Sequence, residues 1–329
     1  MTSVTRLRVM KVLRLVSAPL LLGGVVWLAG PQAIWAAVQG ANAWWLLAGL
    51  LTATVGNASA ALRWAELARW LGHRVRGRWA LAVYFKAVAV NALLPGAVIG
   101  GDMFRAWQLH REGCPKGAAG LSVVLDRLSG LWILFALSAM SLFVGVGSPE
   151  MDTLRRVLRV PEAWPTVVVA VALLALVLLL PLGGLIAVSA VVGHRARPGS
   201  RRAMAVDLLQ RPAALRQYLR QAAASLVVGI FSAGALYCAA RAFRVDLPGW
   251  LIALTAAPIF LLAALPVSFG GWGTREAATV TGWAVFGVAP PLAVGAAAAV
   301  GVYALLQAAL GLFPLPAARR SVAALADGA

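Results

Sequence analysis

The sequence predicts an all-α protein that crosses a lipid bilayer several times, and three observations lead to this fold class. Of the 329 residues, 61% are hydrophobic and 12% are charged, whereas soluble domains are roughly 45–50% apolar and about 25% charged. Apolar runs of the length that spans a bilayer core recur along the chain. The chain has only two cysteines. A soluble enzyme, a disordered chain and a disulfide scaffold are therefore excluded.

Six stretches are apolar and long enough to be full transmembrane helices. These are residues 15–29, 43–62, 128–147, 166–192, 221–242 and 291–313. Two further apolar stretches, 79–99 and 250–289, contain proline and glycine breaks. We therefore expect a single membrane domain over residues 1–329, with about six full spans and two broken or re-entrant helical hairpins. The count becomes eight spans if the hairpins cross the bilayer.

The net charge of +18 lies mostly in segments that connect the predicted spans. The positive segments are 1–14 (+4), 63–78 (+4), 193–220 (+6) and the tail after Phe313 (+1). By contrast, segment 30–42 is uncharged and segment 148–164 balances three arginines against three acids. Segments rich in Lys and Arg stay in the cytoplasm. The pattern predicts cytoplasmic N- and C-termini, and it gives no indication of a nucleic-acid partner.

This topology requires residues 79–116 to enter and leave the bilayer from the cytoplasmic face. The first arm, 79–94, has 16 residues and is about 24 Å long as a helix, which is less than the ~30 Å bilayer core. We expect a re-entrant hairpin whose second arm is 102–112. Its predicted tip contains Pro95, Gly96, Gly100 and Gly101.

The second broken stretch has a similar design, with apolar arms at 250–266 and 277–289. Its predicted tip contains Pro266, Ser268, Gly270, Gly271 and Gly273. It forms either a hairpin that enters from the opposite face or two short full spans joined at Arg275 and Glu276. The charges do not separate these alternatives.

The two breaks suggest an internal repeat. Each has Leu-Pro, then Gly-Gly, then an arginine close to an acid, and each follows two spans and precedes another. The predicted repeat halves, 12–147 and 166–313, would have opposite orientations. Inverted repeats with broken helices are typical of secondary transporters, which hold substrate near the bilayer midplane. Chance similarity is the alternative, because Leu, Pro and Gly are abundant in this chain.

Charged and amide side chains near the breaks are the candidate substrate-binding residues. They are Arg105, Arg127, Arg275, Asp102, Asp126, Glu276, Lys86 and Asn91. A charge at the centre of a membrane helix costs about 2.5–3.5 kcal/mol, so such residues usually pair inside the bundle. An ion pair between Asp126 and Arg105 could hold the first hairpin in place, or the charges could lie at the cytoplasmic interface. Alternatively, the arginines face a lipid phosphate, which a guanidinium group binds through two hydrogen bonds.

Three neighbouring features have structural interpretations. Asn57 and Asn91 lie within apolar runs and predict hydrogen bonds between helices. Arg63 and Trp64 end a predicted span, which favours an anchor at the membrane interface. Thr274 is placed to cap the helix that follows it.

The sequence contains no recognisable catalytic motif. It has no nucleotide-binding, dinucleotide-binding, zinc-protease or serine-nucleophile signature. Cys114 and Cys238 are isolated from any histidine at metal-binding spacing. We therefore expect no catalytic residue, no metal and no cofactor.

At its motifs the chain resembles the transmembrane region of lysylphosphatidylglycerol synthases and their stand-alone, flippase-like relatives in bacteria and archaea. The resemblance spans residues 85–315 and rests on Asn91-x-x-x-Pro95-Gly96-x-x-x-Gly100-Gly101-Asp102-x-x-Arg105, on Leu125-Asp126-Arg127, and on Pro266-Val-Ser-Phe-Gly270-Gly271-Trp-Gly273-Thr-Arg275-Glu276. In multidomain members, this region is implicated in moving an aminoacylated phospholipid between leaflets. The soluble aminoacyl-transferase domain that makes this lipid has no counterpart in the sequence, so the resemblance implies translocation rather than synthesis.

The resemblance leads to a first hypothesis of a lipid translocase in the bacterial cytoplasmic membrane. Its partner would be a membrane lipid: an anionic or aminoacylated phospholipid, or a lipid of the polyprenyl or hopanoid type. A second hypothesis is a membrane-embedded transferase that uses a lipid-linked donor and needs a metal-binding carboxylate cluster. A third is a subunit without transport activity that assists a lipid-modifying enzyme or a glycosyltransferase.

Overall fold

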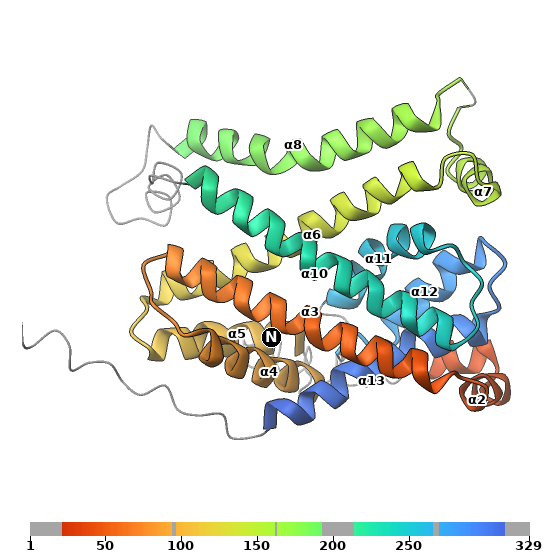
Figure 1. The fold of residues 1–329 in the computed structure, drawn as a ribbon, viewed down its shortest axis with the longest axis horizontal. Coiled ribbons are helices and arrows are strands. Elements are labelled where there is room, and N and C mark those ends of the chain that lie inside the picture. Colours follow the sequence, from red (N-terminus) through yellow and green to blue (C-terminus); the bar gives the residue numbers. More distant parts are fainter. Residues whose placement is uncertain (1–21, 94–96, 162, 193–213, 266–269, 313–329) are drawn as a thin grey trace, which may run out of the picture.

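The computed structural model describes residues 22–93, 97–161, 163–192, 214–265 and 270–312, and it contains helices and their connections, with no strand in these ranges (Figure 1). Residues 22–29 are helical. The other helices are α2 (Pro31–Gln39), α3 (Ala43–Trp70), α4 (Gly77–Leu93), α5 (Ala97–Arg111), α6 (Lys116–Val144), α7 (Pro149–Val157), α8 (Thr166–Val192), α10 (Ala214–Ala242), α11 (Gly249–Ala264), α12 (Thr274–Ala284) and α13 (Pro290–Leu312). The predicted all-α polytopic membrane fold is confirmed.

Four of these helices are long and apolar enough to cross a bilayer, by length and composition. They are α3, α6, α10 and α13, which correspond to four of the six predicted spans. The predicted span 166–192 coincides with α8, whose sequence contains no charged residue. Most of the predicted span 15–29 lies outside the described residues, which include a helix at 22–29.

Two of the predicted spans are shorter than the helices that the structure contains at these positions. Helix α3 continues past residue 62 to Trp70, because the sequence stays rich in Ala, Leu and Trp and has no helix-breaking residue there. Helix α6 begins at Lys116 rather than at residue 128. As a result, Asp126 and Arg127 lie within α6 and not at its start.

The connections 30–42 and 148–164, predicted as loops, each contain a short helix. Helix α2 starts with Pro31, a residue favoured in the first helical turn. Helix α7 has a full set of N-terminal signals: Ser148 accepts a hydrogen bond from the Met151 N–H, Pro149 follows it, and two acidic residues lie in the first turn. These signals are visible in the sequence, but the apolar-run criterion for spans does not detect them.

Helices α4 and α5 form the first predicted hairpin and pack against each other. They have 17 and 15 residues, so each is about 26 Å long or less and shorter than the ~30 Å core. The prediction was wrong for Gly100 and Gly101, which lie inside α5 instead of at the tip. A side chain at Gly101 would collide with the Ala87 carbonyl and the Asn91 amide, so this glycine permits close helix contact. Pro95 and Gly96 lie outside the described residues.

Helices α11 and α12 form the second hairpin, with 16 and 11 residues. The second arm was predicted at 277–289, but α12 spans Thr274–Ala284. Gly270, Gly271 and Gly273 all have positive φ angles, of 56°, 80° and 83°. Residues with a side chain rarely adopt a positive φ, which explains why the break is made of glycines. Pro266 and Ser268 lie outside the described residues.

The helices pack around a central pair formed by α3 and α10, which lie side by side through the middle of the molecule (Figure 1). Helix α4 packs on α13, and α11 packs on α6. Helix α5 also contacts α6, as α12 contacts α13. The two halves therefore make matching contacts when α3 is paired with α10, α4 with α11, α5 with α12, and α6 with α13. Each contact in one half has a counterpart in the other, and the α4–α13 contact corresponds to the α11–α6 contact.

Helix α8 lies at the edge of the bundle and packs against α6 (Figure 1). Pro181 within α8 has no N–H group, so the Val177 carbonyl loses its normal helical partner. The Trp132 indole N–H of α6 donates to this carbonyl at 2.6 Å. This bond satisfies a polar group that would be costly in lipid and attaches α8 to α6.

Candidate functional site

Asp126 is the centre of a buried ion cluster that joins three helices. Its Oδ1 atom accepts a hydrogen bond from Arg63 Nε of α3 at 3.0 Å and forms an ion pair with Arg63 Nη2 at 2.8 Å. Its Oδ2 atom accepts a hydrogen bond from Arg105 Nη1 of α5 at 2.8 Å. All three residues are buried. The Asp126–Arg105 ion pair suggested by the sequence is present, and Arg63 is a second cation that the sequence did not reveal.

Arg63 is fully committed to protein contacts. Its Nη2 atom donates to the Asp126 carbonyl at 3.0 Å, and its Nη1 atom donates to Ser225 Oγ of α10 at 2.9 Å. Gly130 leaves space for the guanidinium group. The predicted interfacial role was therefore wrong for Arg63, and also for Trp64, which is buried and donates from Nε1 to Ser122 Oγ.

Arg105 is held from all sides inside the bundle. Its Nη2 atom donates to Asp102 Oδ1 at 2.8 Å, while its Nη1 atom binds Asp126. Its guanidinium carbon lies 4.9 Å from the centre of the Tyr84 ring and 5.4 Å from that of Trp64. Cation–π contacts with two rings add to the ion pairs, so Arg105 holds α5 against α4 and α6.

Arg127 differs from the other two arginines because it is accessible. Its Nε atom donates to Asp102 Oδ2 at 2.9 Å and its Nη2 atom donates to Asp102 Oδ1 at 3.0 Å. The Nη1 atom has no partner among the described residues, and 40% of the side chain is exposed. Three arginines and two aspartates give this cluster a formal charge of +1.

A second charged group lies at the start of α12. Glu276 accepts hydrogen bonds from the Gly273 N–H at 2.6 Å and from Arg275 Nη2 at 2.8 Å. Arg275 in turn lies over the Trp272 ring, 5.2 Å from its centre. Glu276 caps the helix, whereas Thr274, the predicted cap, is the first helical residue and donates to the Gly271 carbonyl.

A cavity of about 360 Å³ separates the two charged groups and opens between α3, α4, α6, α10, α11 and α13. Its polar and aromatic wall residues are Asn57, Arg63, Tyr84, Asn91, Asp126, Arg127, Ser232, Phe260 and Trp272. Arg127 and Trp272 come from different halves of the chain. Arg105, Asp102, Arg275 and Glu276 are not wall residues; they support Asp126, Arg127 and Trp272, which are.

Comparison with known protein families finds one family whose model matches most of the chain. The family described as the lysylphosphatidylglycerol synthase TM region matches residues 12–311, which include both charged groups and the whole cavity wall. The chain belongs to this family. No curated protein sequence matches the chain.

In this family member, the two predicted asparagines both connect helices. Asn91 accepts a hydrogen bond from the Gly101 N–H at 2.8 Å, across the α4–α5 hairpin. Asn57 donates to Gln307 of α13, whose amide also donates to Thr54 at 3.2 Å. The predicted hydrogen bonds between helices are confirmed, and both asparagines also line the cavity.

Lys86 is the one candidate that lies outside both charged groups and outside the cavity wall. It lies on α4 where this helix meets α13, with its backbone next to Gly311. It is not part of the cavity wall. Its long side chain is half-buried, and no ion pair to it occurs among the described residues.

Three important residues of this family member were not among the predicted site residues. Arg63 was assigned to the end of a span, although the apolar pattern around it continues for another two turns. Trp272 lies between glycines of the predicted tip, and an aromatic residue in that position is a signal of its own. Gln307 is an amide within an apolar run, the same signal that identified Asn57 and Asn91.

Proposed function

We propose that this protein is a lipid translocase that passes the phosphate-bearing headgroup of a membrane lipid through the central cavity. The observation that carries the proposal is the position of Arg127. Its side chain is on the wall of a cavity inside a bundle of membrane-spanning helices, and it keeps one guanidinium nitrogen unused among the described residues. Membership of the lysylphosphatidylglycerol synthase TM region family supports a role with lipids.

The charge of the site favours a phosphodiester. Asp102 holds Arg127 through Nε and Nη2, so that Nη1 is oriented without further ordering cost. The cluster charge of +1 would be neutralised by the single negative charge of a phosphodiester. Asp126 already accepts hydrogen bonds from Arg63 and Arg105, so it is not available for a cationic headgroup. Any such group would meet Asn57 or Trp272 on the wall instead.

We further propose that the two halves form an inverted repeat with hairpins that enter from opposite faces. The interchangeable helix contacts support this arrangement, since α4 on α13 matches α11 on α6. The short arms also support it: α12, with 11 residues, is only about 17 Å long. The cavity would then lie between the hairpins near the bilayer midplane, where transporters with such repeats hold their substrates.

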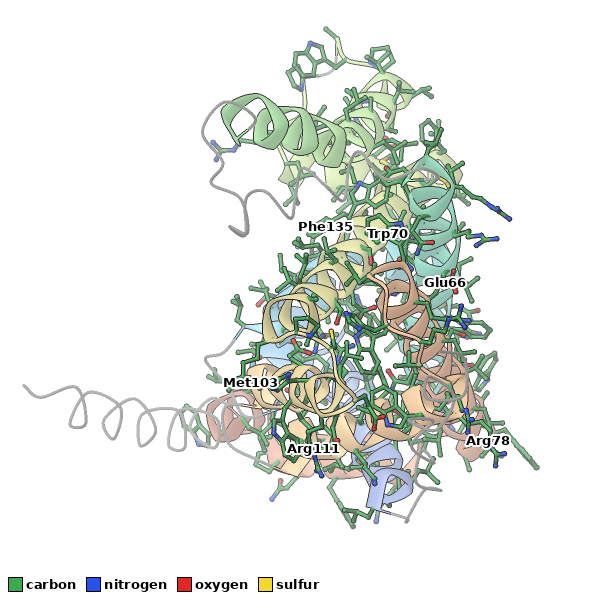
Figure 2. All side chains as sticks on the ribbon, turned by 90° about the vertical axis from the view of Figure 1, so that its left-hand side faces the viewer. Glu66, Trp70, Arg78, Met103, Arg111 and Phe135 are labelled. Atoms are coloured by element: carbon green, nitrogen blue, oxygen red, sulfur yellow. The ribbon has the colours of Figure 1, made fainter. Side chains whose placement is uncertain are left out.

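The proposed orientation places both termini in the cytoplasm of a bacterial cell. Figure 2 looks onto one end of the bundle, where Glu66, Arg78 and Arg111 from α3, α4 and α5 are spread over the face. The basic segment 63–78 connects α3 to α4 at this end. Because basic segments stay in the cytoplasm, we assign this end to the cytoplasmic face.

Purified protein reconstituted into liposomes with fluorescent lipids tests the proposal. Dithionite, which cannot cross the bilayer, destroys the fluorophores that reach the outer leaflet. We expect faster loss of inner-leaflet fluorescence than in protein-free liposomes for phosphatidylglycerol, lysylphosphatidylglycerol or a polyprenyl phosphate sugar, which all carry a phosphodiester. Glucosylceramide, which has no phosphate, is the matched control and should not move. Movement of none of these lipids would contradict translocation, and equal movement of glucosylceramide would contradict phosphate recognition.

A further inference from the structure

Helix α7 lies at the end of the bundle opposite the face that Figure 2 shows. It is seen end-on in Figure 1, whereas the neighbouring helices α6 and α8 run across the picture, so α7 is crosswise to them. Only four residues separate it from α6, which is long and apolar enough to cross a bilayer. Arg155 Nη1 donates to Thr166 Oγ1 at 2.7 Å and thereby holds α7 at the start of α8. Helix α7 therefore lies along the membrane surface.

The apolar side of α7 continues beyond the protein core. Met151 and Leu154 pack against the ends of α6 and α8. Leu158 follows on the same face, four residues after Leu154, but more than half of its side chain is exposed, as is more than half of Val157 and of Trp164. Because Trp is typical of the level where lipid headgroups meet acyl chains, these three side chains are placed to contact lipid.

Two exposed arginines at the end of α7 have unused donors. Arg156 donates from Nε to the Asp152 carbonyl and from Nη2 to Thr153 Oγ1, and its Nη1 atom has no partner within the described ranges. The side chain of Arg159 binds no other described residue. Free arginines beside exposed apolar side chains are the composition of helices that lie on a membrane and bind anionic lipids.

The backbone at Arg159 is a second, independent indication. Its φ angle of 52° lies in the left-handed region, which costs energy for a residue with a side chain. The N–H groups of Arg159 and Val160 donate to the Arg156 and Arg155 carbonyls, an arrangement that glycine usually completes at the end of a helix. In the part of the chain that the structure describes, Arg244 is the one other non-glycine residue with a positive φ. Residues held in such a conformation often have a role of their own.

We propose that α7 is an interfacial helix that binds anionic phospholipids of the leaflet opposite the basic end. Arg156 and Arg159 contact the lipid phosphates, and Val157, Leu158 and Trp164 contact the upper part of the acyl chains. Positive charge beside apolar surface at the level of the bilayer is complementary to an anionic lipid. None of these five residues belongs to the wall of the central cavity. The site is therefore separate from the proposed translocation path and does not depend on it.

A fluorophore attached to Val157→Cys in phosphatidylcholine nanodiscs tests the proposal. Cys114 and Cys238 are buried, so the label reacts with the new, exposed thiol, and the unmodified chain treated in the same way is the blank. The quencher is a nitroxide near the headgroup end of an acyl chain. It is carried by phosphatidylglycerol in one set of nanodiscs and by phosphatidylcholine in the other, at equal trace amounts.

We expect both lipids to quench the label at Val157→Cys, and phosphatidylglycerol to do so about fivefold more effectively or more, because each arginine near an anionic headgroup favours that lipid by about this factor. Quenching by neither lipid, the result if α7 faces water or a partner protein, would overturn the proposal. Equal quenching by both lipids would overturn it as well, since α7 would then not select anionic headgroups.

Adding Arg159→Gly to the labelled chain separates lipid binding from a structural role. Glycine adopts a positive φ without cost, so the melting temperature in detergent should be unchanged or higher, whereas the preference for phosphatidylglycerol should fall about fivefold. Arg244→Gly is the matched control, because it makes the same exchange at the other arginine with a positive φ. The neighbours of Arg244, Phe243 and Val245, are buried, so this arginine lacks exposed apolar partners and its replacement should leave the preference unchanged. An unchanged preference in Arg159→Gly, or an equal loss in Arg244→Gly, would contradict the site on α7.

Discussion

Asp126→Ala is expected to lower the free energy of unfolding by about 3–5 kcal/mol, the usual cost of removing one partner from a buried ion pair. The substitution leaves Arg63 and Arg105 charged and buried without their shared carboxylate. Both arginines connect helices from different parts of the chain to α6. Thermal denaturation of the detergent-solubilised protein, followed by loss of the monodisperse fraction, measures the effect.

Asp102→Ala is the matched control for Asp126→Ala. Asp102 also binds two arginines, but its side chain is 21% exposed and that of Arg127 is 40% exposed. Solvent can therefore compensate for the lost carboxylate, and we expect a clearly smaller loss of stability. If the two variants denature at the same temperature, the buried cluster does not have the structural role assigned to it.

A double-mutant cycle separates the ion pair from the packing of its members. Arg105→Gln and Asp126→Asn should each destabilise the protein, but the double variant should lose less than their sum. The expected coupling is about 0.5–3 kcal/mol, as for residues in direct contact. Additive losses would indicate that Arg105 is held mainly by the Tyr84 and Trp64 rings.

Arg127→Ala is expected to slow the movement of phosphate-bearing lipids about tenfold or more, because a hydrogen bond to a charged group contributes about 1.5–3 kcal/mol. The protein should stay folded, since Asp102 keeps its ion pair with Arg105. Arg127→Lys retains the charge but loses the planar fork, and we expect an intermediate rate. The liposome assay with phosphatidylglycerol gives the rates.

Arg220→Ala controls for the loss of a positive charge alone. Arg220 is on α10, half-exposed and outside the cavity wall. Its replacement should leave the translocation rate unchanged. A rate in Arg127→Ala that equals that of the unmodified protein would exclude Arg127 as the phosphate ligand.

The sequence predicted the helical class and the breaks because both depend on local composition. Apolar runs identify spans directly, and the clustered glycines at 270–273 reflect backbone angles that other residues rarely adopt. The ends of the helices were less well predicted. A length criterion of about 20 residues stopped α3 eight residues early, and it thereby misplaced Arg63 at the membrane surface.

The composition of the site could be predicted only in part because most of its contacts are distant in sequence. The Asp102–Arg105 pair is three residues apart on one helix and is readable from the sequence. By contrast, Asn57 and Gln307 are 250 residues apart. No local pattern indicates that Trp272 and Arg127 share a cavity, or that Arg105 supports the wall without belonging to it.

A bulky residue placed in the cavity tests the central claim most directly. Val228 lines the cavity on α10, while Ile230, two residues later, is exposed on the apolar surface of the same helix. Val228→Trp fills the cavity, and Ile230→Trp adds the same side chain facing lipid. Both variants are compared with the unmodified protein in the liposome assay, at equal amounts of monodisperse protein.

Passage of the headgroup through the cavity predicts that Val228→Trp abolishes movement of phosphatidylglycerol, whereas Ile230→Trp moves it at the unmodified rate. Full activity in Val228→Trp would contradict the account, because the lipid would then cross the membrane by a route outside the cavity.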